Sequence, residues 1–120
     1  MRAVATESEV EQALRDFVAA LRRQVRIERV LLYGSYVNGK PHEWSDFDIA
    51  IVSPDFEGVP LWRRQEVIAS LSVGTDPRIT PIAFSSSEYH NPSAHSFLRE
   101  IKRTGRVVYD AEAAGRSTRK

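Results

Sequence analysis

The chain has 120 residues and is 42% hydrophobic, so it can bury one modest core and is too short for two domains. Its 17 basic and 16 acidic residues leave a net charge of +1, without the global field of a dedicated nucleic-acid-binding surface. The sequence has no cysteine, which excludes disulfides, thiolate nucleophiles and cysteine-based zinc sites. It shows no signal-peptide core and no membrane-spanning stretch, so we expect a cytoplasmic protein.

The first half of the chain predicts one long helix and two buried strands. Thr6 and Glu9 have the spacing of a capping box, and apolar residues then recur at helical intervals, which predicts a helix over about residues 7–24. The short apolar runs 29–33 (RVLLY) and 47–52 (FDIAIV) predict strands in the interior of a sheet.

The next segment predicts a helix followed by a third strand. Pro60 favours a helix start, and an apolar stripe follows it as far as a stop at Gly74. Residues 79–85 (ITPIAFS) predict a strand. Because Pro81 cannot donate a ladder hydrogen bond, this strand is expected at an edge or at a bulge.

The last segment predicts a helix and a short strand. Asn91-Pro92 opens the helix, Gly105 ends it, and the strand follows at 107–109. The order of elements favours a single α/β (α+β) domain over residues 1–120, with a mixed sheet of about four strands and helices packed on it. Residues 111–120 are expected to form a disordered tail.

Two aspartates begin the second predicted strand. Asp46 and Asp48 lie two residues apart, so in an extended strand their side chains point to the same face. Two like charges at this distance repel each other, unless a divalent cation such as Mg²⁺ lies between them and leaves further positions for water and phosphate. An isolated Asp-x-Asp pair is more often a solvated strand end than a metal site.

A glycine-rich turn follows the first predicted strand. Gly34 permits a sharp turn, and Ser35 can open a short helix whose backbone N–H groups face a phosphate. Gly39 permits a second close approach to a ligand. An isolated Gly-Ser pair is usually only a turn, but together with the aspartates it supplies the minimum equipment for phosphoryl or nucleotidyl transfer.

The joint spacing of these residues resembles a known signature. The stretch GSYVNGKPHEWSDFDI at 34–49 is similar to the motif of the DNA polymerase beta nucleotidyltransferase superfamily, and most of all to its minimal nucleotidyltransferase (MNT) branch. The leading helix, the stretch PIAFSSSEY and the ending FLREIKRTGRVVYD also resemble that family, so the similarity covers nearly the whole chain.

The resemblance implies a site and a reaction. Asp46 and Asp48 would hold Mg²⁺ and the nucleoside triphosphate, and Gly34 and Ser35 would bind its β and γ phosphates. The implied reaction transfers a nucleoside monophosphate, AMP from ATP or its equivalent from another nucleotide, to an acceptor hydroxyl and releases pyrophosphate. Lys40, which follows Gly39, could reach the triphosphate or be a solvated loop residue.

The sequence departs from the family at a third carboxylate. This acid usually lies on the strand after the second helix, and alignment on ITPIAFS puts Arg78 at its expected position. Asp76, two residues earlier, is the candidate third catalytic and metal-binding acid, if a bulge delivers it to the pair. Arg78 could then neutralise phosphate charge or be a solvated strand residue.

The resemblance also implies a partner. Minimal nucleotidyltransferases are often encoded beside a HEPN-domain toxin, and as the antitoxin they modify a tyrosine of that toxin with AMP. A homodimer is the other expected assembly. The alternative function is a catalytically weak or inactive nucleotide-binding module that acts as a steric antitoxin or sensor. A small-molecule modifier like the aminoglycoside nucleotidyltransferases is weaker, because those enzymes carry an added domain.

Several other polar and aromatic residues remain open. Tyr36 and Trp44 flank the motif and could stack on a base or be structural. His42, His90 and His95 do not have a usual metal spacing and receive no role.

Overall fold

The computed structural model describes residues 4–42, 45–92 and 96–113, so Trp44 and His95 lie outside the described residues. The elements in chain order are α1 (Glu7–Arg22), β1 (Arg29–Tyr33), α2 (Ser35–Asn38), β2 (Phe47–Ser53), a 3-10 turn η1 (Pro54–Phe56), α3 (Leu61–Leu71), β3 (Ile79–Ser85), α4 (Ser86–His90), α5 (Ser96–Thr104) and β4 (Arg106–Asp110). The predicted α/β class with a mixed four-stranded sheet is confirmed.

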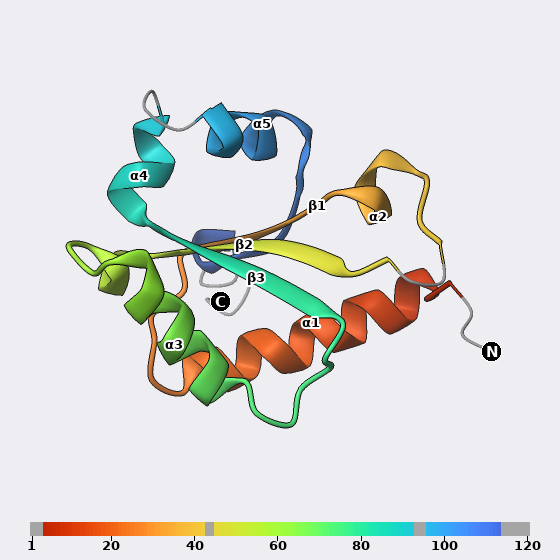
Figure 1. The fold of residues 1–120 in the computed structure, drawn as a ribbon, viewed down its shortest axis with the longest axis horizontal. Helices are drawn as coiled ribbons and strands as arrows, with labels where there is room; N and C mark the ends of the chain where they lie inside the picture. Colours follow the sequence, from red (N-terminus) through yellow and green to blue (C-terminus); the bar gives the residue numbers. More distant parts are fainter. Residues whose placement is uncertain (1–3, 43–44, 93–95, 114–120) are drawn as a thin grey trace.

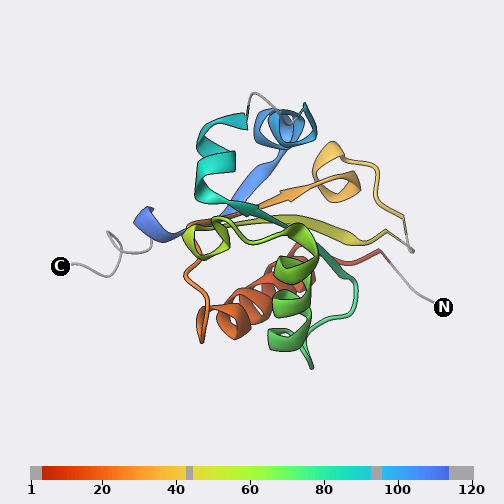
Figure 2. The ribbon, with the colours of Figure 1, turned by 60° about the vertical axis from the view of Figure 1, so that its left-hand side comes forward.

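The sheet has the strand order β3-β2-β1-β4 and separates two helical layers (Figure 1). β1 is antiparallel to β2 and β4, whereas β2 and β3 are parallel. α1 and α3 cover one face, and α4 and α5 cover the other, as the turned view in Figure 2 also shows. We call these the α1 face and the α5 face.

Alternation along the strands gives each face its own core. On the α1 face, apolar strand residues such as Phe47 and Ile49 pack against Phe17 of α1 and Ile68 of α3. The core of the α5 face consists of Leu31, Ala50, Val52, Phe84, Tyr89, Leu98 and Ile101. After Asp48, the stretch from Ile49 to Val52 of β2 is therefore a continuous apolar run, as is typical of a strand covered on both sides.

The capping box at the start of α1 is present as predicted. The Glu9 N–H donates to Thr6 Oγ1 at 3.1 Å, and the Thr6 N–H donates to Glu9 Oε1 at 2.7 Å. The helix ends at Arg22, two residues before the expected end at residue 24, because residues 23–25 turn the chain toward β1.

Both edge strands are irregular or poor in donors. Of the two positions that Pro81 predicted, an edge or a bulge, β3 has the edge, and its pairing with β2 runs from Phe47↔Ile79 to Ser53↔Ser85 with no shift in register. At the other edge, β4 contains a register shift opposite Val30 and Leu31. Such a bulge bends the strand and breaks the regular ladder.

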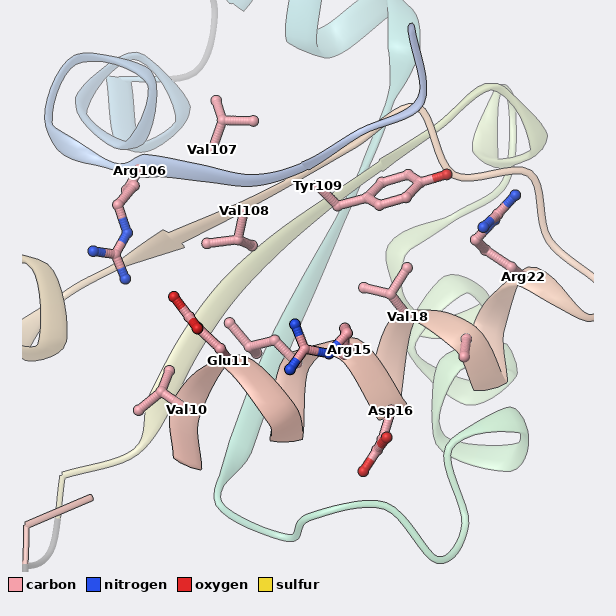
Figure 3. A pocket seen from close by; sticks show the side chains of 12 residues that line it. Val10, Glu11, Arg15, Asp16, Val18, Arg22, Arg106, Val107, Val108 and Tyr109 are labelled. Carbon is pink, nitrogen blue, oxygen red and sulfur yellow. The ribbon is translucent and has the colours of Figure 1, made fainter. Parts of the chain in front are cut away.

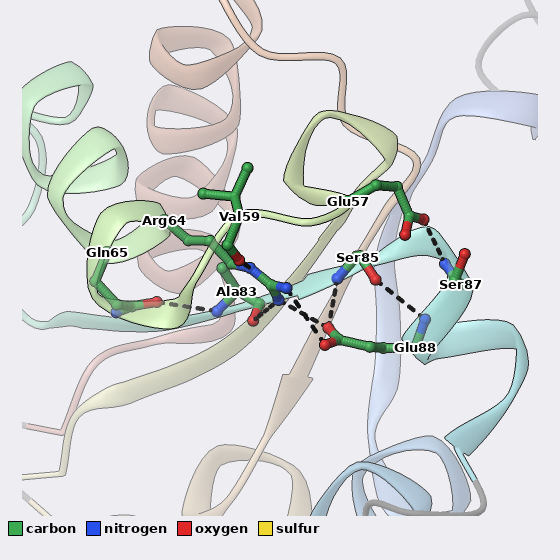
Figure 4. Close-up of polar contacts among 8 residues, drawn as sticks. All are labelled: Glu57, Val59, Arg64, Gln65, Ala83, Ser85, Ser87 and Glu88. Carbon is green, nitrogen blue, oxygen red and sulfur yellow. Dashed lines mark hydrogen bonds and ion pairs between the residues drawn. The ribbon is translucent and has the colours of Figure 1, made fainter.

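A buried arginine ties α3 to β3 and α4 (Figure 4). The Arg64 guanidinium donates to the carbonyl oxygens of Val59 and Ala83 and forms an ion pair with Glu88, at 2.7 Å from Nη1 to Oε1. Glu88 Oε1 also accepts from the N–H of Ser85, the N-cap of α4. Because a buried guanidinium needs all of these acceptors, the network fixes the C-terminal end of β3.

The C-terminal part differs from the sequence-based expectation in two places. The short helix α4 was not predicted, although Ser85 and Glu88 form a second capping box. Residues 111–113, expected within a disordered tail, continue from β4 as a helical turn whose N–H groups at Glu112 and Ala113 donate to Asp110. Residues 114–120 lie outside the described residues.

Candidate active site

The turn after β1 has the conformation that the sequence predicts. Gly34 has φ 82° and ψ −152°, a region that side chains with a Cβ essentially do not enter. Its carbonyl oxygen accepts hydrogen bonds from the N–H groups of Val37 and Asn38, at 3.0 Å each. The N–H groups of Ser35 and Tyr36 precede the first helical hydrogen bonds of α2, which are donated by Val37 and Asn38.

The carboxylate of Asp48 lies against this turn. A Cβ built on Gly34 would stand 2.5 Å from Asp48 Oδ2. Asp48 is also the β2 residue opposite Tyr33, the last residue of β1. The structure thus brings the glycine turn and the aspartate pair together, since only a glycine leaves room for the carboxylate.

The two aspartates lie on the α5 face at the N-terminal end of β2. Phe47 between them packs into the core of the α1 face, so Asp46 and Asp48 point the other way. Asp46 is exposed and Asp48 is half-buried. Buried Ser45 shapes the approach to the strand, because its Oγ accepts from the N–H of His42 and its own N–H donates to His42 O, both at 2.9 Å.

Burial, and to a smaller degree the charge of Asp46, raise the pKa of Asp48. Burial and then the charge of Asp48 also raise the pKa of Tyr33. A half-buried carboxylate beside a second carboxylate is electrostatically unfavourable by itself, and a divalent cation reverses that penalty. The donor set therefore fits Mg²⁺, which needs one or two protein carboxylates and keeps positions for water and phosphate.

Gly39 and Lys40 lie at the far end of α2. Gly39 has a left-handed conformation, with φ 82° and ψ 16°, and the N–H groups of both residues reach the carbonyl oxygen of Ser35. Both residues are exposed, so the Lys40 side chain starts from a surface turn next to the glycine cradle.

The structure does not bring Asp76 to the aspartate pair. Asp76 accepts three hydrogen bonds from Arg78, with 2.6 Å from Nη2 to Oδ2, and the Arg78 guanidinium lies over the Phe47 ring, 4.8 Å from its centroid. The pKa of Arg78 is raised mainly by Asp76 and further by Glu9 of α1. The ion pair therefore lies toward the α1 face.

This geometry bears on the expected role of Asp76 and on the two alternatives left open for Arg78. Within residues 4–42, 45–92 and 96–113, no group of three or more His, Asp or Glu side chains is arranged to hold a metal ion. Asp76 is thus not a third member of a cluster with Asp46 and Asp48. Arg78 is also turned away from the face on which phosphates would lie, because its charge is held by Asp76.

Thr80 is the residue that sequence reasoning missed. The parallel register places Thr80 directly opposite Asp48, and its side chain is exposed. Neighbours in a parallel pair share a face of the sheet. The position beside Asp48 on β3 therefore carries a hydroxyl. Residues 78 and 80 are two apart, so the alternation of side chains along a strand cannot tell which of them lies beside Asp48. Only the pairing of β3 with β2 shows that it is Thr80.

Tyr36, which was left open between base stacking and structure, has a structural role. Its hydroxyl accepts from the N–H of Ala5 at 3.2 Å, and its ring meets Phe47 edge-on at 5.0 Å. Tyr36 therefore attaches α2 and the segment before α1 to the α1 face.

Four hollows on the described surface are lined by residues other than Asp46 and Asp48. The groove in Figure 3 has a volume of about 730 Å³ and runs between α1 and β4, with Val10, Val18 and Tyr109 on its walls. These walls belong to the α1 face, the opposite side of the sheet from Asp48. Over the part of the chain that the structure describes, no helix is long and apolar enough to cross a membrane.

Comparisons with known proteins identify the family. The family model of the nucleotidyltransferase domain matches residues 14–103. A candidate protein adenylyltransferase of Methanocaldococcus jannaschii is 33% identical over 102 residues, which cover 82% of this chain and 97% of the relative. The chain therefore belongs to the nucleotidyltransferase domain family and is a nucleotidyltransferase enzyme, as the motif predicts.

Solved structures agree on the fold. A candidate nucleotidyltransferase from Sulfolobus solfataricus superposes with a TM-score of 0.66 at 14% identity, over 86% of this chain and 82% of the other. A structure described as a toxin-antitoxin with AMP-PNP superposes with a TM-score of 0.51 at 20% identity, over 80% of this chain and 72% of the other.

Proposed function

We propose that this enzyme transfers AMP from ATP to an acceptor hydroxyl in the cytoplasm, with Mg²⁺ held by Asp46 and Asp48. In this proposal Gly34 and Ser35 hold the β and γ phosphates, and Gly39 and Lys40 border the same cradle. The observation that supports the proposal is the close approach of the Asp48 carboxylate to Gly34, because a carboxylate pair beside a glycine turn is the arrangement that Mg²⁺ and phosphate binding would need.

The step forms one bond and breaks another at the α-phosphorus. The acceptor oxygen bonds to phosphorus, the bond to the bridging oxygen of pyrophosphate breaks, and the proton of the acceptor hydroxyl passes to water. When bound, Mg²⁺ neutralises phosphate charge and holds the reacting groups in line. The chain contributes the two carboxylates, the backbone N–H groups of the turn at Ser35, and the close approach that Gly34 permits.

Two substitutions test this assignment. Asp46→Ala and Asp48→Ala are each expected to abolish Mg²⁺-dependent release of pyrophosphate from ATP without loss of the fold, measured by circular dichroism. Asp16→Ala removes an exposed carboxylate of α1 and serves as the matched control. Unchanged turnover in both site variants would contradict the assignment.

We propose a tyrosine of a HEPN-domain toxin as the acceptor, with this chain as the antitoxin. The relative from Methanocaldococcus jannaschii carries the name of a protein adenylyltransferase, which supports a protein acceptor. The test is mass spectrometry of the protein encoded beside this chain after incubation with Mg²⁺ and ATP. Added AMP that disappears in a Tyr→Phe variant of the acceptor is expected, and an unmodified protein would contradict this acceptor. Sedimentation of the chain alone tests the homodimer.

A second candidate is a module that binds nucleotide with little or no turnover. The observation that favours it is Thr80 opposite Asp48, with Asp76 bound to Arg78, so the described residues supply two of the three expected acids. Calorimetry that shows binding of ATP with Mg²⁺, combined with no release of pyrophosphate for any acceptor, would favour this candidate.

A further inference from the structure

Phe97 is an aromatic residue that the core does not require. Helix α5 is attached to the sheet by Leu98 and Ile101, which are 0% and 1% exposed. Phe97 precedes this stripe and remains 51% exposed. About half of the apolar surface of Phe97 therefore stays in water, so its burial contributes less to folding than that of a core residue.

The contact of Phe97 places it beside the aspartates. Its ring meets the ring of Tyr33 edge-on, with 5.7 Å between centroids and an interplanar angle of 83°. Tyr33 immediately precedes Gly34 in the chain and lies opposite Asp48 in the β1–β2 register. The two rings are therefore adjacent to the glycine turn and the carboxylates, on the same α5 face.

We propose that Tyr33 and Phe97 form the wall against which the nucleobase of the bound nucleotide packs. The inference rests on the proposed function, which puts the triphosphate at Gly34 and Asp48. A nucleobase is flat and largely apolar, so it gains most from a rigid aromatic surface that excludes water from its face.

The position of the wall favours the nucleobase over the acceptor. The base is joined to its phosphates through one ribose, and Tyr33 is joined directly to Gly34, so a single nucleotide can occupy both surfaces. Tyr36, the other described aromatic residue next to the glycine turn, is already held by Ala5 and Phe47. The two rings would contact the face of the base and not its hydrogen-bonding edges. Purines are therefore expected to bind more tightly than pyrimidines, because their contact area is larger.

The test compares a ligand that has a base with one that lacks it. Calorimetry in Mg²⁺ measures the Kd of a non-hydrolysable ATP analogue and of inorganic tripolyphosphate for the wild-type chain and for Phe97→Ala, Phe97→Leu and Phe97→Tyr. Phe97→Ala is expected to weaken the ATP analogue about 5-fold or more and to leave tripolyphosphate unchanged. Phe97→Leu keeps apolar volume without the ring, so its Kd for the ATP analogue is expected to lie between those of Phe97→Ala and the wild-type chain. Phe97→Tyr keeps the ring and is expected to bind the analogue as the wild-type chain does.

Trp62→Ala is the matched control, because Trp62 is 66% exposed on α3, which packs on the other face of the sheet. Equal binding of the ATP analogue by all Phe97 variants would overturn the inference and leave the proposed function intact. If Phe97→Ala changes only the KM of the acceptor in a transfer assay, the inference is overturned in favour of an acceptor site. Failure of the wild-type chain to bind either ligand would overturn the inference together with the proposed function.

Discussion

Asp48 and Thr80 face each other across the parallel strands β2 and β3, at the end of the sheet where the glycine turn lies. A carboxylate at position 80 would share one face with Asp46 and Asp48 and supply the expected third acid. Thr80→Asp is therefore expected to raise the rate of Mg²⁺-dependent transfer about tenfold or more, since a positioned general base contributes about 10²–10⁴-fold in enzymes. Pyrophosphate release at saturating ATP measures it.

Two variants control this gain. In Thr80→Asn the new side chain has the shape of aspartate without its charge, so the rate of transfer should stay near that of the wild-type chain. Asp76→Ala should also leave the rate nearly unchanged, because Asp76 is bound to Arg78. Loss of transfer in Asp76→Ala together with no gain in Thr80→Asp would return the third role to Asp76.

Gly34 leaves no space for a Cβ, so its substitution is expected to reduce both the stability and the activity of the protein. Gly34→Ala forces a Cβ into an unfavourable backbone region and against Asp48, which is expected to cost about 1–3 kcal/mol in the free energy of unfolding. Gly58→Ala is the control, because Gly58 also has a positive φ but a Cβ there meets nothing within 4 Å. Urea unfolding measures both variants, and equal losses would show that the contact with Asp48 is unimportant.

The raised pKa of Asp48 predicts a dependence of stability on pH. The folded chain binds the proton of the Asp48 carboxyl group more tightly than the unfolded chain does. The contribution of Asp48 to the free energy of unfolding is therefore fully present below the unfolded pKa of about 3.9, and it is lost as the pH rises through the folded pKa. Without divalent cations, Asp48→Asn should therefore raise the Tm at neutral pH, and the difference should shrink in acid. Added Mg²⁺ should stabilise the wild-type chain and not the variant.

The buried ion pair between Arg64 and Glu88 predicts a variant that loses stability and keeps binding. Arg64→Ala removes the guanidinium that donates to Glu88 and to two carbonyl oxygens, which is expected to cost about 2–3 kcal/mol. The network lies at the C-terminal end of β3, away from Thr80, so the KM for ATP should stay unchanged. Arg63→Ala removes an exposed neighbour and should be nearly neutral in urea unfolding.

Local patterns in the sequence predicted most elements, because they act within a few residues. The capping box at Thr6 predicted the start of α1, and Pro81 predicted that β3 lies at an edge or a bulge, of which the structure shows the edge. Helix α4 was missed because its five residues are too few for a periodic apolar pattern, and only the Ser85 cap marks it.

The candidate site could be predicted only in part, because sequence patterns fix only the geometry of residues that are close together in the chain. The motif gave Asp46 and Asp48 as neighbours on one face, since two residues in one strand share a fixed geometry. Whether position 76, 78 or 80 lies beside them depends on how β3 pairs with β2, and this register is set by packing across the sheet. Tyr33 and Phe97 likewise meet only in the fold.

The bulge in β4 has a consequence for how other proteins can bind. A regular edge strand invites a further strand from another chain, and proteins prevent this with bulges, prolines and charged residues. Here one edge has the bulge and exposed Arg106, and the other has Pro81. Both edges therefore carry features that disfavour growth of the sheet by added strands, which favours binding of partners through the side-chain surfaces of its helices and loops.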